Sequence, residues 1–153
     1  MKKLYLSFIL ILGLVLCQSQ LSAQVLNPND PVITYDSNHP PTLPPWDSIG
    51  KWVRTVRMNW NTNQYKCYIY RNMAFRLLFP KSWTDTSTKK YPMVIFLHGV
   101  GERGNIYDNE LQLKWEGQRF LNAVNNGEYD GFVLYPQSQN GFWGEPLYSN
   151  LID

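Results

Sequence analysis

The residues of this chain best placed to do chemistry are His98 and the glycines that follow it. The segment 98–104 reads His-Gly-Val-Gly-Glu-Arg-Gly, and it comes directly after the unbroken apolar run 93–97. Glycines let backbone amides come close to a ligand, and in open α/β sheets ligands bind beyond the carboxyl ends of the strands. Backbone N–H groups at such a point can stabilise an oxyanion. The sequence therefore predicts a binding or catalytic loop here.

The elements that must position this loop can be predicted from the surrounding pattern. The apolar run 93–97 is typical of a strand buried on both faces. Apolar residues at helical spacing predict a helix over 110–125 that Gly127 ends, and a second apolar strand follows at 132–135. Strand, glycine loop, helix and strand form a βαβ unit, which builds a parallel sheet.

Ahead of this unit, alternating residues predict two antiparallel strands over 50–60 and 64–70, a turn at Arg71-Asn72 and a further strand over 73–79. Residues 24–47 contain six prolines, so we expect an extended leader with little regular structure. The predicted fold class is therefore α/β, with a partial domain over residues 48–153 that follows a leader over residues 24–47.

Residues 1–23 have the pattern of a secretory signal peptide. Lys2 and Lys3 precede an apolar run that ends in small residues at Ala23. The alternatives are a retained anchor, for which the run is short, and lipidation of Cys17, which follows Leu16 where a small residue is required. We therefore expect a secreted or periplasmic protein with no stable membrane association after signal cleavage.

The charge balance argues against a nucleic-acid partner. Loss of Lys2 and Lys3 with the signal peptide leaves 12 basic against 12 acidic residues, so the mature chain is close to neutral. Cys17 leaves with the same segment, and Cys67 then has no partner for an intramolecular disulfide. We expect Cys67 to be a small core residue rather than a nucleophile.

Three segments carry a resemblance to a known family. These are residues 75–81 (FRLLFPK), residues 91–104 (YPMVIFLHGVGERG) and residues 132–137 (FVLYPQ). Together they resemble the secreted esterase and predicted-peptidase branch of the α/β-hydrolases, which includes relatives of dienelactone hydrolase and polyhydroxybutyrate depolymerases. The resemblance covers residues 73–153 and implies the N-terminal portion of that fold, with antiparallel leading strands and then the βαβ parallel unit.

The resemblance also implies roles within the glycine loop. His98 and Gly99 would turn the chain after the strand, with His98 as a structural residue of that turn. The backbone N–H of Val100 would be one oxyanion donor, and Gly99 and Gly101 permit the turn that presents it.

The catalytic triad of the family is missing from these 153 residues. No Gly-x-Ser-x-Gly occurs, and neither Ser138 nor Ser149 has flanking glycines. His39 lies in the leader, so no Ser-His-Asp triad can be assembled. We therefore expect the N-terminal fragment of a larger hydrolase, inactive by itself.

The same segment offers weaker indications of a nucleotide-binding, glycosidase or metal site. The glycines of residues 99–104 match the dinucleotide fingerprint, but the acidic residue expected about 20 positions on would fall in or just past the predicted helix. Glu102-Arg103 suits an ion pair that braces the loop. Asp108 and Glu110 suit the start of a helix better than a glycosidase pair. No Cys/His set has metal-ligand spacing, so neither cofactor nor metal is predicted.

Two functions follow as hypotheses. The first is a secreted carboxylesterase-like serine hydrolase that acts on a small-molecule or polysaccharide-linked ester, or on a peptide bond. The alternative is a secreted, non-catalytic module that binds carbohydrate or protein through its many aromatic side chains, which make up 15% of the chain.

Overall fold

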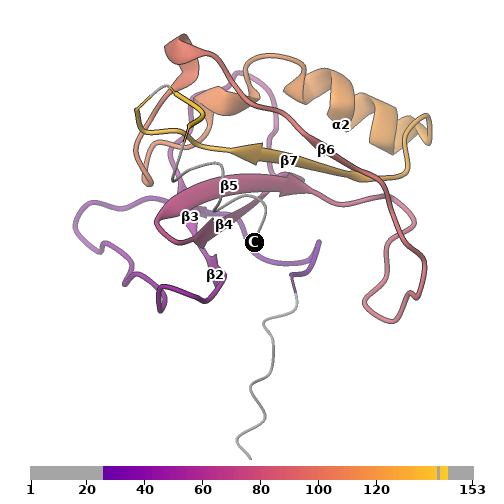
Figure 1. Cartoon of the computed structure of the whole chain (residues 1–153), viewed down its shortest axis with the longest axis horizontal. Helices are drawn as coiled ribbons and strands as arrows, with labels where there is room; N and C mark the ends of the chain where they lie inside the picture. Colours follow the sequence, from indigo (N-terminus) through magenta and orange to yellow (C-terminus); the bar gives the residue numbers. More distant parts are fainter. Residues whose placement is uncertain (1–25, 141, 145–153) are drawn as a thin grey trace, which may run out of the picture.

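A mixed sheet of five strands forms the centre of the molecule (Figure 1). The computed structural model describes residues 26–140 and 142–144. The strand order is β2-β4-β5-β7-β6. Along the chain the elements are β1 (Ile33–Thr34), β2 (Gly50–Lys51), β3 (Val53–Arg54), β4 (Lys66–Tyr70), β5 (Met73–Leu78), β6 (Met93–Ile95), the 3₁₀ turns η1 (Val100–Glu102) and η2 (Leu111–Leu113), the helix α2 (Gly117–Asn126) and β7 (Phe132–Pro136).

The antiparallel half of the sheet is built on the β4–β5 hairpin. Tyr70 pairs with Met73 across a two-residue loop, in which Arg71 and Asn72 have φ of 46° and 59°. Positive φ at both loop positions is the geometry of a type I′ turn, whose twist matches that of the flanking strands. The turn and the strand that follows it lie where the sequence pattern predicted them.

The parallel half is the pair β6 and β7, connected through α2. Met93 pairs with Phe132 and Ile95 with Leu134 in parallel, whereas β7 runs antiparallel to β5. Antiparallel leading strands followed by a parallel pair with a helical crossover are compatible with a partial α/β-hydrolase-like fold.

The prediction that β6 is buried on both faces is wrong. β6 is an edge strand, and Met93, Ile95 and Leu97 are 52%, 45% and 39% exposed. Their neighbours Val94 and Phe96 pack against the core cluster under α2. A run of apolar residues indicates a buried strand only when both faces and both neighbours are present, and here β7 is the only neighbour among the described residues.

The predicted strand over 50–60 is much shorter in the structure. Its regular part ends at Arg54, and beyond it the N–H groups of Arg57 and Met58 donate to the carboxylate of Glu110. Backbone donors bonded to a side chain cannot extend a β ladder. A long-range contact with Glu110 therefore replaces strand pairing in this segment.

The predicted helix over 110–125 is divided into η2 and α2. Glu116, the residue before α2, has φ of 61°, which interrupts the helix. Two tyrosine hydroxyls bond to carbonyls beside the break, from Tyr135 to Trp115 O at 3.1 Å and from Tyr65 to Gly117 O at 2.8 Å. Gly127 ends α2 in the left-handed conformation, with φ of 78°, as the sequence predicted.

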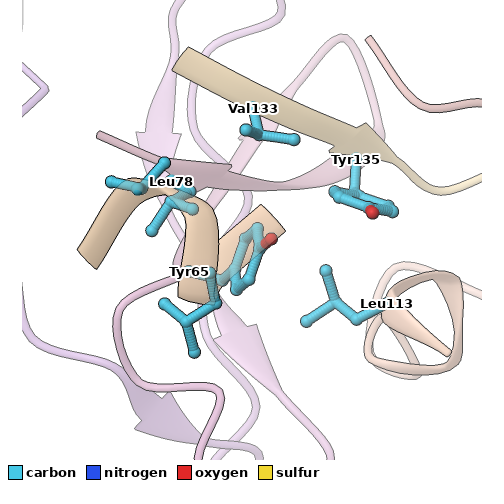
Figure 2. Close-up of a cluster of buried hydrophobic side chains, with 7 residues drawn as sticks. Tyr65, Leu78, Leu113, Val133 and Tyr135 are labelled. Carbon is cyan, nitrogen blue, oxygen red and sulfur yellow. The ribbon is translucent and has the colours of Figure 1, made fainter. Parts of the chain in front are cut away.

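The main core lies between the sheet and the helical segments (Figure 2). Tyr65, Leu113 and Tyr135 are fully buried there, and the rings of Tyr65 and Tyr135 meet edge to face, 5.7 Å apart. A smaller cluster around Trp52 and Ile69 packs against the other part of the sheet. Figure 2 shows the side chains of the main cluster converging from β5, β7 and η2.

The proline-rich leader is attached to the sheet. β1 pairs in parallel with β3. The sequence pattern did not predict β1, which lies within the leader. The carboxylate of Asp30 is buried and contacts the ammonium of Lys51 at 2.6 Å and the hydroxyl of Tyr68 at 2.7 Å. These contacts fix residues 26–35 across β3 and β4. No helix in the described part of the chain has the length and hydropathy of a membrane span.

Candidate active-site loop

The glycine loop lies at the carboxyl ends of two parallel strands. β6 and β7 run in the same direction, so the segments after Ile95 and after Pro136 emerge at one edge of the sheet. Residues 96–104 and 137–140 therefore meet there. This is the edge at which α/β proteins bind ligands.

His98 joins the two segments through both of its ring nitrogens. The side chain is 3% exposed. Its Nε2 accepts a hydrogen bond from the backbone N–H of Ser138 at 3.0 Å, and its Nδ1 lies 2.7 Å from Gly99 O. An imidazole that accepts at Nε2 and donates at Nδ1 is neutral. Trp143 covers it, with the indole Nε1 donating to His98 O at 2.9 Å, so His98 occupies a structural position.

Val100 is the first residue of the short turn η1. Gly99 is extended, with φ of −80° and ψ of 178°, and Glu102 N donates to Gly99 O at 3.2 Å. No hydrogen bond within the described residues is donated by the N–H of Val100. The residue is 54% exposed. The first N–H groups of a helical turn have no partner within the turn, so this donor is open to a ligand.

Glu102 connects the turn η1 to residues 114 and 115. Its carboxylate is buried and accepts a hydrogen bond from the indole of Trp115 at 2.8 Å, and Lys114 Nζ lies 3.7 Å away. The ion pair expected of Glu102-Arg103 is formed by Glu102, with Lys114 as its partner. Arg103 is exposed, because adjacent residues in a tight turn point in different directions.

Gly104 is the glycine of the loop that the packing requires. A Cβ at this position would lie 2.1 Å from Asp108 O and 2.8 Å from Gln137 Nε2. Its N–H points to Ser138 O at 3.4 Å, and the Gln137 amide donates to Asp108 O at 3.0 Å. The loop and the segment after β7 are thus in contact at both ends of the loop.

A buried charge cluster beneath the loop is the feature that the sequence analysis missed. Glu110 is fully buried and accepts hydrogen bonds from Arg54, Thr62 and the N–H of Met58, the last at 2.9 Å. The fully buried Arg76 lies on the other side, with Nη1 3.8 Å from the Glu110 carboxylate. Glu110 was expected at the start of a helix. Only the presence of charged Arg54 and Arg76 within alternating apolar segments could have indicated a buried partner.

The carboxyl groups of Glu110 and of nearby Asp108 have lowered pKa values. Burial raises the pKa of Glu110, but the hydrogen bonds from Arg57 N–H, Thr62, Met58 N–H and Arg54 outweigh burial, and the pKa lies below its ordinary value. The guanidinium of Arg57, whose Nη2 lies 2.6 Å from Asp108 Oδ2, holds the pKa of Asp108 down as well. Both carboxylates are thus anions held by arginines, and neither is a proton donor at neutral pH.

Cys67 lies beside this cluster. It is buried, and burial raises the pKa of its thiol, so it is held as a neutral thiol with low reactivity. Within the described residues, no three His, Cys, Asp or Glu side chains are grouped so that they could hold a metal ion.

Comparisons with known proteins give little beyond this geometry. No family model and no curated protein matches the chain. Among solved structures, the chain is similar to a thermostable esterase, with 36% sequence identity and a TM-score of 0.36. The match covers 50% of this chain and 20% of the esterase chain.

Proposed function

We propose that this chain is the N-terminal part of a secreted serine hydrolase of the carboxylesterase type, and that Val100 N–H is one donor of its oxyanion hole. The observation that carries the proposal is that Val100 is exposed beyond the carboxyl end of β6, beside the end of β7, and that its N–H donates no hydrogen bond within the described residues. The sequence of residues 91–104 and the signal-peptide pattern of residues 1–23 support it.

The chemistry assigned to Val100 is electrostatic. When a serine Oγ attacks an ester carbonyl, the carbonyl oxygen gains negative charge in the tetrahedral intermediate. A backbone N–H fixed 2.7–3.1 Å from that oxygen stabilises it, and losing one such donor typically costs about 10²–10³ in rate. Collapse of the intermediate expels the alcohol and leaves the acyl group on the serine, from which water then removes it.

The surroundings of the loop suit a fixed donor. His98 ties the loop to Ser138, Glu102 ties it to Trp115, and Gly104 packs against Asp108. A donor that is already oriented needs no reorganisation when charge develops, which is the basis of electrostatic preorganisation. Exposed Val100, Trp115 and Phe142 provide an apolar surface near the loop for the acyl or alcohol part of an ester.

The proposal places the nucleophile, the acid and the base outside these 153 residues. Ser138 is fully buried and its N–H donates to His98, so it does not serve as the nucleophile. The substrate class proposed is a small-molecule or polysaccharide-linked ester, with an amide as the harder alternative.

The test compares this chain with the product of the reading frame extended beyond Asp153. We expect the chain alone to give no labelling by a fluorophosphonate and no turnover of p-nitrophenyl acetate. The extended protein should contain Gly-x-Ser-x-Gly and show both. In the extended protein, Val100→Pro removes the N–H and should lower kcat by about 10²–10³, whereas Val100→Ala keeps the N–H and should leave kcat nearly unchanged.

Two outcomes would contradict the proposal. Serine labelling of the chain alone would show that the nucleophile is present after all. A stop codon directly after Asp153, together with a soluble product that melts cooperatively, would favour the non-catalytic binding module.

A further inference from the structure

A pocket of about 260 Å³ opens at the end of the sheet opposite the glycine loop. Leu78 lines it and pairs with Val133 near the start of β7, whereas the loop lies beyond Pro136 at the other end of that strand. The leader, β4, the end of β5 and the last turn of α2 surround it. The pocket is therefore separate from the candidate active-site loop, and nothing in the proposed function uses it.

Positive charge is concentrated in this pocket. Lys66 and Lys81 both line it, and no carboxylate is among the described residues that do so. Lys66 is half-buried, and its side chain forms no hydrogen bond or ion pair within the described part of the chain. Burial lowers the pKa of its ammonium, although Asp30 acts in the opposite direction. Asp30 is already bound to Lys51 and Tyr68, so the ammonium of Lys66 has no carboxylate of its own among the residues that the structure describes.

Lys81 offsets the partial negative charge at the C-terminal end of α2, which would otherwise repel an anion in the pocket. Its Nζ donates to Asn125 O at 2.8 Å, at the C-terminal end of α2. The last carbonyls of a helix carry partial negative charge, and a cation placed there offsets it. An ammonium has three donors, so Lys81 can still contribute a hydrogen bond to a ligand.

Aromatic and other apolar residues also line the pocket. Phe79 and Trp83 are among them and meet edge to face with ring centroids 5.1 Å apart, and Pro28 and Pro80 line it as well. A half-buried Trp face is a surface on which a sugar or aromatic ring stacks. Pockets for drug-sized ligands begin at about 300 Å³, so this one suits a single ring.

We propose that this pocket binds a carboxylate carried on one six-membered ring, with the carboxylate at Lys66 and the ring against Trp83. Two sources share this chemistry. One is an acidic sugar residue of a polysaccharide, and the other is an aromatic acid. The proposal does not rest on the proposed ester hydrolysis and stands or falls separately from it.

The experiment is calorimetric titration of the full chain with galacturonate and with benzoate, each beside its neutral counterpart, galactose or benzamide. One acid should bind saturably, at least about tenfold more tightly than its neutral counterpart, which corresponds to 1.4 kcal/mol. The acid that binds identifies the source. Lys66→Met should weaken its binding by a similar factor, and Trp83→Ala should weaken both the acid and the neutral ring.

Lys90→Met is the matched control, because it removes the same charge from an exposed residue and should leave binding unchanged. If Lys66→Met does not fold, Lys66→Arg, which keeps the charge, should retain binding. The proposal is overturned if neither acid binds better than its neutral counterpart, or if Lys66→Met and Lys90→Met weaken binding equally.

Discussion

The Nε2 of His98 accepts a hydrogen bond from the backbone N–H of Ser138 at 3.0 Å, and this bond joins the segments that leave the ends of β6 and β7. The two residues are 40 positions apart in the chain. Both residues are buried, so water cannot readily replace this hydrogen bond if His98 is changed. A single imidazole thereby fixes the position of the loop that carries Val100.

Replacing His98 should destabilise the chain. His98→Ala removes the imidazole that accepts from the buried Ser138 N–H, and loss of a hydrogen-bond partner at a buried group costs about 1–3 kcal/mol. Urea unfolding measures the loss. His39→Ala is the control, because His39 lies in an exposed part of the leader and its side chain pairs with the exposed Asp36. Equal unfolding free energies for the two variants would contradict the structural role of His98.

Replacing Glu110 should lower the free energy of unfolding by more than replacing His98 does. Glu110→Gln removes the counter-ion of the half-buried Arg54 and the buried Arg76, and breaking a buried pair typically costs about 3–5 kcal/mol. Thermal or urea unfolding monitored by circular dichroism gives the value. The exposed Glu128→Gln removes the same charge from the surface and should change the unfolding free energy by less than about 0.5 kcal/mol.

The same carboxylate should make stability depend on acid pH. Its pKa is below the ordinary value of 4.5 in the folded chain, so the unfolded chain takes up a proton first as the pH falls. The stabilisation is therefore complete above about pH 4.5 and is lost as the pH falls toward the folded pKa. In urea titrations across this range, the unfolding free energy of Glu110→Gln should fall less steeply than that of the unmodified chain. Parallel slopes would show that Glu110 does not titrate in this way.

Two glycines of the loop should respond oppositely to alanine. Gly104→Ala places a methyl group 2.1 Å from Asp108 O, a backbone atom that must then move, and such overpacking costs about 1–3 kcal/mol. Gly101→Ala meets nothing within 4 Å and should be neutral in the same unfolding assay. If Gly104→Ala left the unfolding free energy unchanged, the contact between Gly104 and Asp108 would be less close than in this structure.

The open edge at β6 should promote self-association. Met93, Ile95 and Leu97 present apolar side chains on a strand whose outer edge has no partner strand in the described part of the chain, and such edges template further pairing. Ile95→Lys should reduce association in sedimentation velocity without lowering the melting temperature. Val56→Lys adds the same charge at another exposed apolar residue and should leave association unchanged. If both variants associate alike, the edge is not the contact.

The local elements were predictable wherever short-range chemistry decides them. The turn at Arg71-Asn72, the strand β5 and the stop at Gly127 follow from turn residues, apolar alternation and helix capping, all of which act over a few neighbours. The glycine loop was located for a similar reason, because its strand and glycines are contiguous in the chain.

The long-range contacts of Glu110 and the exposure of β6 could not be predicted from local sequence patterns. Glu110 bonds to Arg54 and Thr62 over separations of 56 and 48 residues, and no local pattern reports such a pairing. Burial of charged residues also runs against the usual expectation that they are solvated. The exposure of β6 depends on which strands lie beside it, a property of the whole sheet rather than of residues 93–97.

The attachment of the leader limits how the chain can be shortened. Asp30 satisfies the buried hydroxyl of Tyr68 and neutralises Lys51, and Tyr35 stacks on Tyr107 with ring centroids 4.5 Å apart. A version that began at residue 48 would leave that hydroxyl without Asp30 as its acceptor. It would also remove the leader side chains that pack against Trp52 and Tyr107. Proteolytic trimming or tag placement should therefore stop before Leu26, although the proline-rich composition suggests a dispensable tail.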